Sequence, residues 1–155
     1  MQSLPSAEAI ALTLSTLLRR KVQVTQASVP DRLPILGFYR STADHDVAVC
    51  ESDIAFAAHA AAAFALIPAS IAQESVKAGV LDEGLQEIFA EVLNVLSRVF
   101  ADTDGMRITL TSKVFPPSDI PAQMTKCPAG GEVGFEVSID GYGKGFLGLG
   151  LLVAV

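Results

Sequence analysis

The apolar pattern of residues 81–101, LDEGLQEIFAEVLNVLSRVFA, is the feature that most restricts how this chain folds. An α-helix turns by about 100° per residue, and at that angle nine large apolar side chains fall within roughly 80° of the direction of Leu85. They are Leu85, Ile88, Phe89, Val92, Leu93, Val95, Leu96, Val99 and Phe100. Asp82 is suited to cap this helix, and Glu83 complements its positive end. The segment therefore predicts a long helix with one face buried by the rest of the chain.

The opposite face of the predicted helix carries Glu87, Glu91, Asn94 and Arg98. Asn94 is the only asparagine in the chain, and asparagine is a poor helix former because its amide competes for backbone hydrogen bonds. The i, i+3 spacing places the Glu91 carboxylate beside the Asn94 amide, while Glu87 and Glu91 repel mildly unless a cation is near. Two interpretations are open: a solvent face with no special role, or a surface that acts on a partner.

Length and composition indicate one folded domain spanning residues 1–155. Half of the residues are hydrophobic and 18% are charged, which excludes a disordered chain. The net charge is −6, and the longest basic run is Arg19-Arg20-Lys21, so we expect no nucleic-acid partner. Cys50 and Cys127 match no metal spacing and indicate reduced thiols. The first residues lack the basic start of a signal peptide, and we expect a cytoplasmic protein.

Residues 54–73 contain no charged side chain over about the length of a membrane span. Alanine dominates this stretch, His59 interrupts it, and Pro68 breaks it. We therefore interpret it as two heavily buried helices and expect no membrane association. His59 is expected to be an interior or interface histidine.

The order of predicted elements is α-β-β-β-α-α-α-β-β-β. The helices cover residues 6–20, 51–67, 68–78 and 81–101, and the strands cover residues 22–29, 33–40, 46–50, 106–115, 132–139 and 144–155. This order indicates an α+β fold of two pseudo-symmetric α-β-β-β halves, which form one largely antiparallel sheet packed against helices. The helix with Glu91 and Asn94 would be exposed on one side.

Three short motifs resemble known sites but do not fit them. The GKGFLG sequence of residues 143–148 resembles a dinucleotide fingerprint, but it continues as an apolar strand instead of opening a helix. The DTDG sequence of residues 102–105 lacks the outer ligands of a calcium loop. The DHD sequence of residues 44–46 is more typical of a solvated turn than of a metal site. No serine or cysteine has a recognisable catalytic base, so we expect neither a bound metal nor a bound cofactor on this chain.

The E-x-x-N pair Glu91/Asn94, together with its surroundings, resembles the CheC/CheX/FliY family of chemotaxis phosphatases, and the CheX-like branch most closely. The resemblance covers about residues 5–155. It rests on the first helix running into Lys21-Val-Gln-Val-Thr, the alanine-rich helices, the E-x-x-N helix, and the ITLTSKVFPP sequence from Ile108.

The resemblance implies a function in two-component signalling. Members of the family hydrolyse the aspartyl phosphate of a response-regulator receiver domain such as CheY. Asn94 would orient the attacking water, Glu91 would pair with the receiver's lysine, and Mg²⁺ would belong to the receiver. Glu87 and Arg98 would contact the docked partner. A homodimer formed through the sheets is also implied.

The sequence departs from the family at two places. Ser97 and Arg98 follow the asparagine where members usually have small residues and glycine, and Arg98 would either bind phosphoryl oxygens or obstruct docking. The first helix has Glu8, but Ala11 stands where a second site would need asparagine. The alternative is a non-catalytic receiver-binding or flagellar-switch-like adaptor of the same fold.

Overall fold

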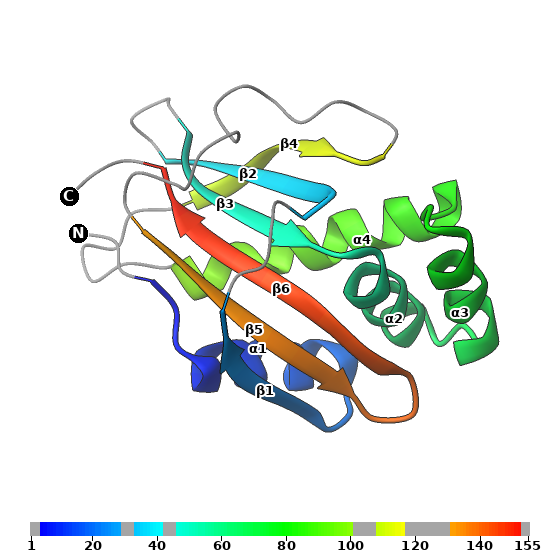
Figure 1. The fold of residues 1–155 in the computed structure, drawn as a ribbon. Helices are drawn as coiled ribbons and strands as arrows, with labels where there is room; N and C mark the ends of the chain where they lie inside the picture. The colour runs from blue at the N-terminus through cyan, green and yellow to red at the C-terminus, as the bar shows by residue number, and fades with distance from the viewer. Residues whose placement is uncertain (1–3, 29–32, 42–45, 101–107, 117–130, 153–155) are drawn as a thin grey trace.

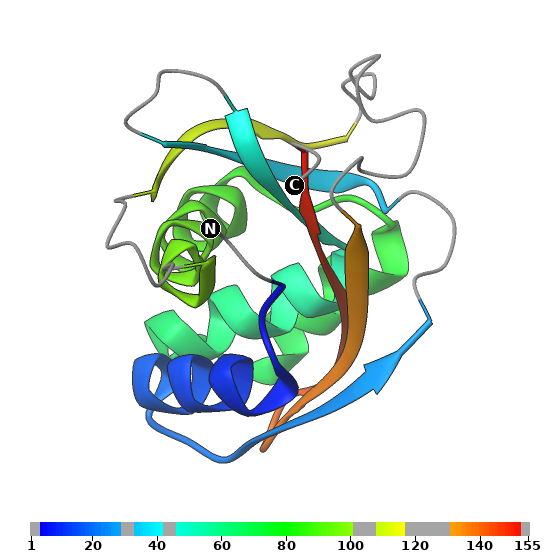
Figure 2. The ribbon, with the colours of Figure 1, turned by 90° about the vertical axis from the view of Figure 1, so that its left-hand side faces the viewer.

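The computed structural model describes residues 4–28, 33–41, 46–100, 108–116 and 131–152. The helices of this part are α1 (Ala7–Leu18), α2 (Ile54–Ala65), α3 (Ala69–Ala78), α4 (Glu83–Leu96) and the 3-10 helix η1 (Ser97–Phe100). The strands are β1 (Val22–Ala27), β2 (Ile35–Ser41), β3 (Asp46–Ser52), β4 (Ile108–Val114), β5 (Glu132–Ile139) and β6 (Gly143–Leu151). The strands form one antiparallel sheet, and the helices lie on one face of it (Figures 1 and 2).

The strand order of the sheet is β1-β5-β6-β3-β2-β4. In this order β1 corresponds to β4, β2 to β5 and β3 to β6. If each strand is replaced by its counterpart, the same order is obtained when the sheet is read from the opposite edge. The two halves are therefore related by a pseudo-twofold axis that passes between β3 and β6, the central pair. α1 packs on β1, and α4 packs on β4. The predicted α+β class and the two α-β-β-β halves are confirmed.

The alanine-rich helix α2 lies at the centre of the helical layer, against β6 and α4. Its residues from Phe56 to Ala63 are all buried. A side chain on Gly145 of β6 would overlap the Phe56 backbone, so α2 lies directly on the strand. The Phe56 ring meets the Phe89 ring of α4 edge to face, with 5.9 Å between centroids. Burial thus explains the uncharged stretch only from Phe56 to Ala63. The expectation of two heavily buried helices is wrong for α3, in which only Ala72 and Ser75 are buried, because α3 packs on α2 at the edge of the helical layer. No described helix is long and apolar enough to cross a membrane.

Two predicted helix boundaries are wrong by three or more residues. Glu51 and Ser52 were expected to open a helix, but they pair with Gly148 and Leu147 in the sheet and are buried. Asp53 begins α2 instead, because its carboxylate accepts a hydrogen bond from the Phe56 backbone N–H at 2.7 Å. The long helix also does not run to residue 101: α4 ends at Leu96 and continues as η1.

The C-terminal strand β6 lies in the middle of the sheet, between β5 and β3. Its apolar side chains, Leu147, Leu149 and Leu151, belong to the core of the monomer. The glycine-rich sequence of residues 143–148 forms a strand of this sheet, as expected. The apolar character of β6 is accounted for within one chain, and the homodimer stays a prediction.

Two helices end in an unusual way. Arg19 caps α1 and Leu66 caps α2, both with left-handed backbones at φ 53° and 59°. This conformation is unfavourable for residues other than glycine, because the Cβ atom crowds the following carbonyl. Gly79 ends α3 in the same conformation without that cost.

Candidate functional site

The candidate site lies on α4, which is fixed at its N-terminal end by side-chain caps. The Asp82 carboxylate accepts a hydrogen bond from the Leu85 backbone N–H at 2.9 Å. The Gln86 side-chain amide donates to the Leu81 carbonyl oxygen at 2.9 Å. These contacts fix the register at which the apolar stripe enters the core.

The buried face of α4 and η1 matches the predicted stripe. Its fully buried members are Leu85, Phe89, Val92, Leu93, Leu96 and Phe100. Glu87, Glu91, Asn94 and Arg98 are all exposed on the opposite face. The structure therefore leaves all four residues predicted from the sequence exposed to solvent, three of them on α4 and Arg98 on η1.

α4 contacts β2 at Leu93, the residue before Asn94. A Cβ atom on Gly37 of β2 would lie 3.2 Å from the Leu93 side chain, so the absence of a side chain at Gly37 leaves the space for Leu93. The Tyr39 hydroxyl, also on β2, donates a 2.6 Å hydrogen bond to the Leu93 carbonyl oxygen. Because β2 holds Leu93 on the sheet-facing side of α4, the neighbouring Asn94 side chain is held on the outer side of the helix.

The Tyr39 hydroxyl is a permanent donor in this contact. Burial raises the pKa of Tyr39 well above 10.0, and burial likewise raises the pKa of the neighbouring Cys50 thiol. Both groups therefore stay protonated at neutral pH. The Tyr39 ring also packs on Phe100 of η1, with 5.4 Å between ring centroids.

The helix tightens directly after Asn94. The Ser97 hydroxyl donates to the Asn94 carbonyl oxygen at 2.7 Å, and the Ser97 backbone N–H bonds the same oxygen. This i to i+3 bonding is that of a 3-10 helix, which turns more tightly than an α-helix. Arg98 thus follows Asn94 along a 3-10 turn. Its position relative to the Glu91/Asn94 pair therefore differs from the one that a continuous α-helix would give it.

Within the described residues, neither the Glu91 carboxylate nor the Asn94 amide has a hydrogen bond or an ion pair. An amide offers both donors and an acceptor, and a carboxylate offers acceptors only. In the described part of the chain, no group of three or more His, Cys, Asp or Glu residues could hold a metal ion. The arrangement can orient a water and bind a cation supplied by another molecule, and it offers no nucleophile of its own.

The other candidates drawn from the sequence lie elsewhere. His59 is buried in α2, as expected, and does not line the exposed face of α4. On α1, Glu8 is exposed, and Ala11 offers a methyl group where an amide would be needed. The calcium-like loop 102–105, most of the DHD turn and Cys127 lie outside the described residues.

Three residues that support the site were missed from the sequence: Gly37, Tyr39 and Ser97. The first two lie more than fifty positions from Asn94, and the pairing of β2 with α4 could not be deduced from local periodicity. Ser97 was noted only as a departure from the family. A serine three residues after a mid-helix position can bond back to the backbone, and this was the one local signal available.

No protein-family model and no curated protein matches the chain, whereas several solved structures share its fold. FliY of Thermotoga maritima is 19% identical, with a TM-score of 0.63 over 94% of this chain and 83% of that chain. CheX of Borrelia burgdorferi, solved in a complex with CheY, BeF3 and Mg²⁺, is 12% identical, with a TM-score of 0.52 over 93% of both chains. FliM of H. pylori, solved in a complex with FliG, is 14% identical, with a TM-score of 0.55 over 92% of this chain and 84% of that chain.

These likenesses confirm the fold expected from the sequence. The chain has the fold of the CheC/CheX/FliY type, and FliM middle domains share it. At such low identities the comparisons bear on architecture alone.

Proposed function

We propose that this protein docks on a CheY-like receiver domain and hydrolyses its aspartyl phosphate. The observation that carries the proposal is the exposed Glu91/Asn94 pair, which has no partner among the described residues, on a capped helix of a CheX-type fold. One relative of this fold was solved with CheY and Mg²⁺, which supports a receiver as the partner.

The chemistry asked of this chain is small. Phosphoryl transfer is accelerated mostly by positioning and by charge balance. The Asn94 amide would orient a water in line with the phosphorus, and the Mg²⁺ would come with the receiver. The Glu91 carboxylate would pair with a lysine beside the phosphorylated aspartate and set the register of the complex, and Glu87 would extend this acidic surface.

The support from β2 matters for this role, because positioning is sensitive to small displacements. A shift of about 1 Å in a catalytic group can reduce a rate by about 100-fold. The contacts of Leu93 with Gly37 and Tyr39 restrain α4 at the residue next to Asn94. Tyr39 and Gly37 are therefore proposed as positioning residues.

The experiment measures loss of ³²P from a panel of phosphorylated CheY-like receivers, with and without the protein. Asn94→Ala is expected to reduce the acceleration by about 100-fold, since the water would lose its orienting amide. Gln73→Ala is the matched control, because Gln73 is an exposed amide on α3 and not on α4. Both variants should unfold at wild-type temperatures. Undiminished activity in Asn94→Ala would remove the mechanism.

The second candidate is a non-catalytic receiver-binding adaptor. It is favoured by the exposed Arg98 on the 3-10 turn that follows Asn94, because a long cation there can block close docking. The adaptor binds a receiver without accelerating label loss. If Arg98 is the obstruction, reversing its charge with Arg98→Glu should restore turnover; if Arg98 assists the phosphoryl group, the same change should lower it.

A further inference from the structure

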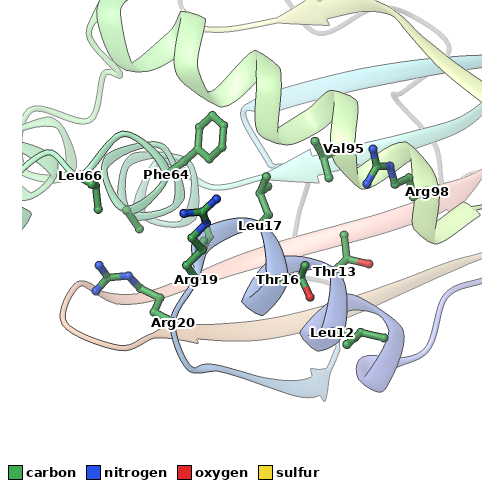
Figure 3. A pocket seen from close by; sticks show the side chains of 12 residues that line it. Leu12, Thr13, Thr16, Leu17, Arg19, Arg20, Phe64, Leu66, Val95 and Arg98 are labelled. Atoms are coloured by element: carbon green, nitrogen blue, oxygen red, sulfur yellow. The ribbon is translucent and has the colours of Figure 1, made fainter.

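A groove lies between α1, the C-terminal end of α2 and the junction of α4 with η1 (Figure 3). Its volume is about 750 Å³. α1 contributes Leu12 and Leu17, α2 contributes Phe64, and α4 contributes Val95. The groove reaches the exposed face of α4 and η1 through Arg98, which lines it, but neither Glu91 nor Asn94 does.

Exposed apolar side chains are concentrated at this groove. Six large hydrophobic residues are exposed in the described part of the chain, and three of them line the groove. Leu12 is 69% exposed, Leu66 is 77% exposed and Phe64 is 39% exposed. Single exposed apolar residues are ordinary, whereas a contiguous set beside a groove indicates a surface that another protein covers.

The groove is also basic, in a chain whose net charge is −6. Arg19, Arg20 and Arg98 line it, and no acidic residue does. Arg20 is held by the β5–β6 hairpin, since it donates to the Asp140 carbonyl oxygen at 2.9 Å and lies 4.8 Å from the Tyr142 ring centre. Among the described residues, neither Arg19 nor Arg98 has an ion-pair partner.

The two residues with left-handed backbones at helix ends both face this groove. Arg19 and Leu66 are the only residues other than glycine with positive φ in the described part of the chain, and both line the groove. Glycine would be the stabilising choice at each helix end. The chain instead places a cation and a large apolar side chain there, which is explained if both side chains contact a ligand.

We propose that this groove binds an amphipathic segment of a partner protein, one that presents carboxylates beside apolar side chains. Leu12, Phe64 and Leu66 would bury the apolar side of the segment, and the guanidinium groups of Arg19 and Arg98 would pair with its carboxylates. Glu91 and Asn94 do not line the groove, so this proposal does not rest on the phosphatase proposal, although Arg98 belongs to both the groove and the proposed receiver-docking surface.

The experiment measures fluorescence anisotropy of a labelled helical peptide of about 18 residues, roughly five turns, with leucine on one face and glutamate along its borders. Arg19→Glu is expected to weaken binding by about tenfold or more. Lys77→Glu is the control, because it makes the same charge change on α3, outside the groove. Leu12→Ser should weaken binding, and Val80→Ser, an exposed apolar residue elsewhere, should not.

Each possible result decides the question. Equal weakening by Arg19→Glu and Lys77→Glu would reduce the effect to overall charge and overturn the proposal. Equal binding of a peptide with glutamine in place of glutamate, or no measurable binding of the acidic peptide, would also overturn it. Asn94→Ala should bind the peptide like the wild type, so failure of the phosphatase proposal leaves this one standing.

Discussion

At the scale of single residues, Tyr39 connects the sheet to the proposed site. Its hydroxyl bonds the Leu93 carbonyl oxygen, and its ring packs on Phe100 of η1. One side chain of β2 thereby holds both α4 and the 3-10 turn that follows it. The position of Asn94 therefore depends on a residue that is fully buried in the monomer.

Tyr39→Phe should test this dependence. The change removes one buried hydrogen bond but keeps the ring, and it should cost about 1–2 kcal/mol of unfolding free energy in a urea titration. Tyr142→Phe is the control, since that hydroxyl also donates to a backbone carbonyl, that of Ile67, at 2.8 Å, in a hydrogen bond that does not involve α4. Receiver dephosphorylation should fall in Tyr39→Phe and stay near wild type in Tyr142→Phe. An equal loss in both would count against a positioning role.

His59 makes stability depend on pH. Burial lowers its pKa below 6.5, and this outweighs the opposing effects of its hydrogen bond to the Lys144 backbone and of Asp53. The unfolded chain therefore takes up a proton more readily than the folded chain. Stability contributed by neutral His59 is complete above the unfolded pKa and is lost as the pH falls from 6.5 toward the folded-state pKa.

We expect the unfolding free energy to fall between about pH 7 and pH 5 in the wild type. A His59→Gln variant should show a flatter profile over that range. Asp53 acts in the opposite sense, because burial raises its pKa and the folded state then binds its proton more readily. Subtracting the profile of the variant from that of the wild type isolates His59. Parallel profiles would show that His59 does not titrate on unfolding.

At the scale of elements, the sequence predicted the buried face of α4 and the end of α3 at Ala78, but neither the exposure of α3 nor the change of geometry after α4. The apolar stripe of α4 and its cap at Asp82 could be predicted because both depend on residues close together in the sequence. The change to 3-10 geometry at Ser97 was not predicted, since its one local signal is the hydroxyl of Ser97 and the contact of Tyr39 with Leu93 comes from a distant strand. The prediction that Glu51 begins a helix was wrong for a similar reason. An acidic residue before an alanine-rich run is typical of a helix start, but pairing with Gly148 in the sheet keeps Glu51 extended.

Replacing Leu66, the left-handed cap of α2, is expected to increase stability and to weaken binding. Leu66→Gly should raise the unfolding free energy by about 1 kcal/mol, because glycine adopts φ 59° without steric cost. The same change should weaken peptide binding in the groove. Gly79→Ala is the reverse control: open space surrounds its Cβ position, so its cost of about 1 kcal/mol should come from the backbone alone. Thermal unfolding measures both, and a destabilised Leu66→Gly would show that the leucine packs usefully within the monomer.

At the scale of the whole molecule, the two halves interlock. β1 of the first half pairs only with β5, and β4 of the second half pairs only with β2, among the strands that the structure describes. The order of elements along the sequence indicated the two halves, but the exchange of edge strands was not deducible from it. Strand partners distant in sequence are selected by packing of the whole core, and no local pattern encodes them.

This interlocking predicts that neither half folds alone. A fragment of residues 1–80 would leave β1 without its described neighbour β5, and β3 without β6. We expect fragments 1–80 and 81–155 to show no cooperative thermal transition by circular dichroism when studied separately, and to regain one when mixed. A cooperative transition in either isolated fragment would contradict the interlocked arrangement.

The pseudo-twofold axis places α1 and α4 in corresponding positions, but the central helix α2 packs extensively against α4 and only lightly against α1. The flank of α1 is left open there, and the groove occupies it (Figure 3). If the two halves were two identical chains forming a dimer, any substitution in the helix corresponding to α1 would also occur in the helix corresponding to α4. Here both helices belong to one chain, so each can change independently. One surface can thus be adjusted to one partner while the other is adjusted to a second, and neither adjustment constrains the other.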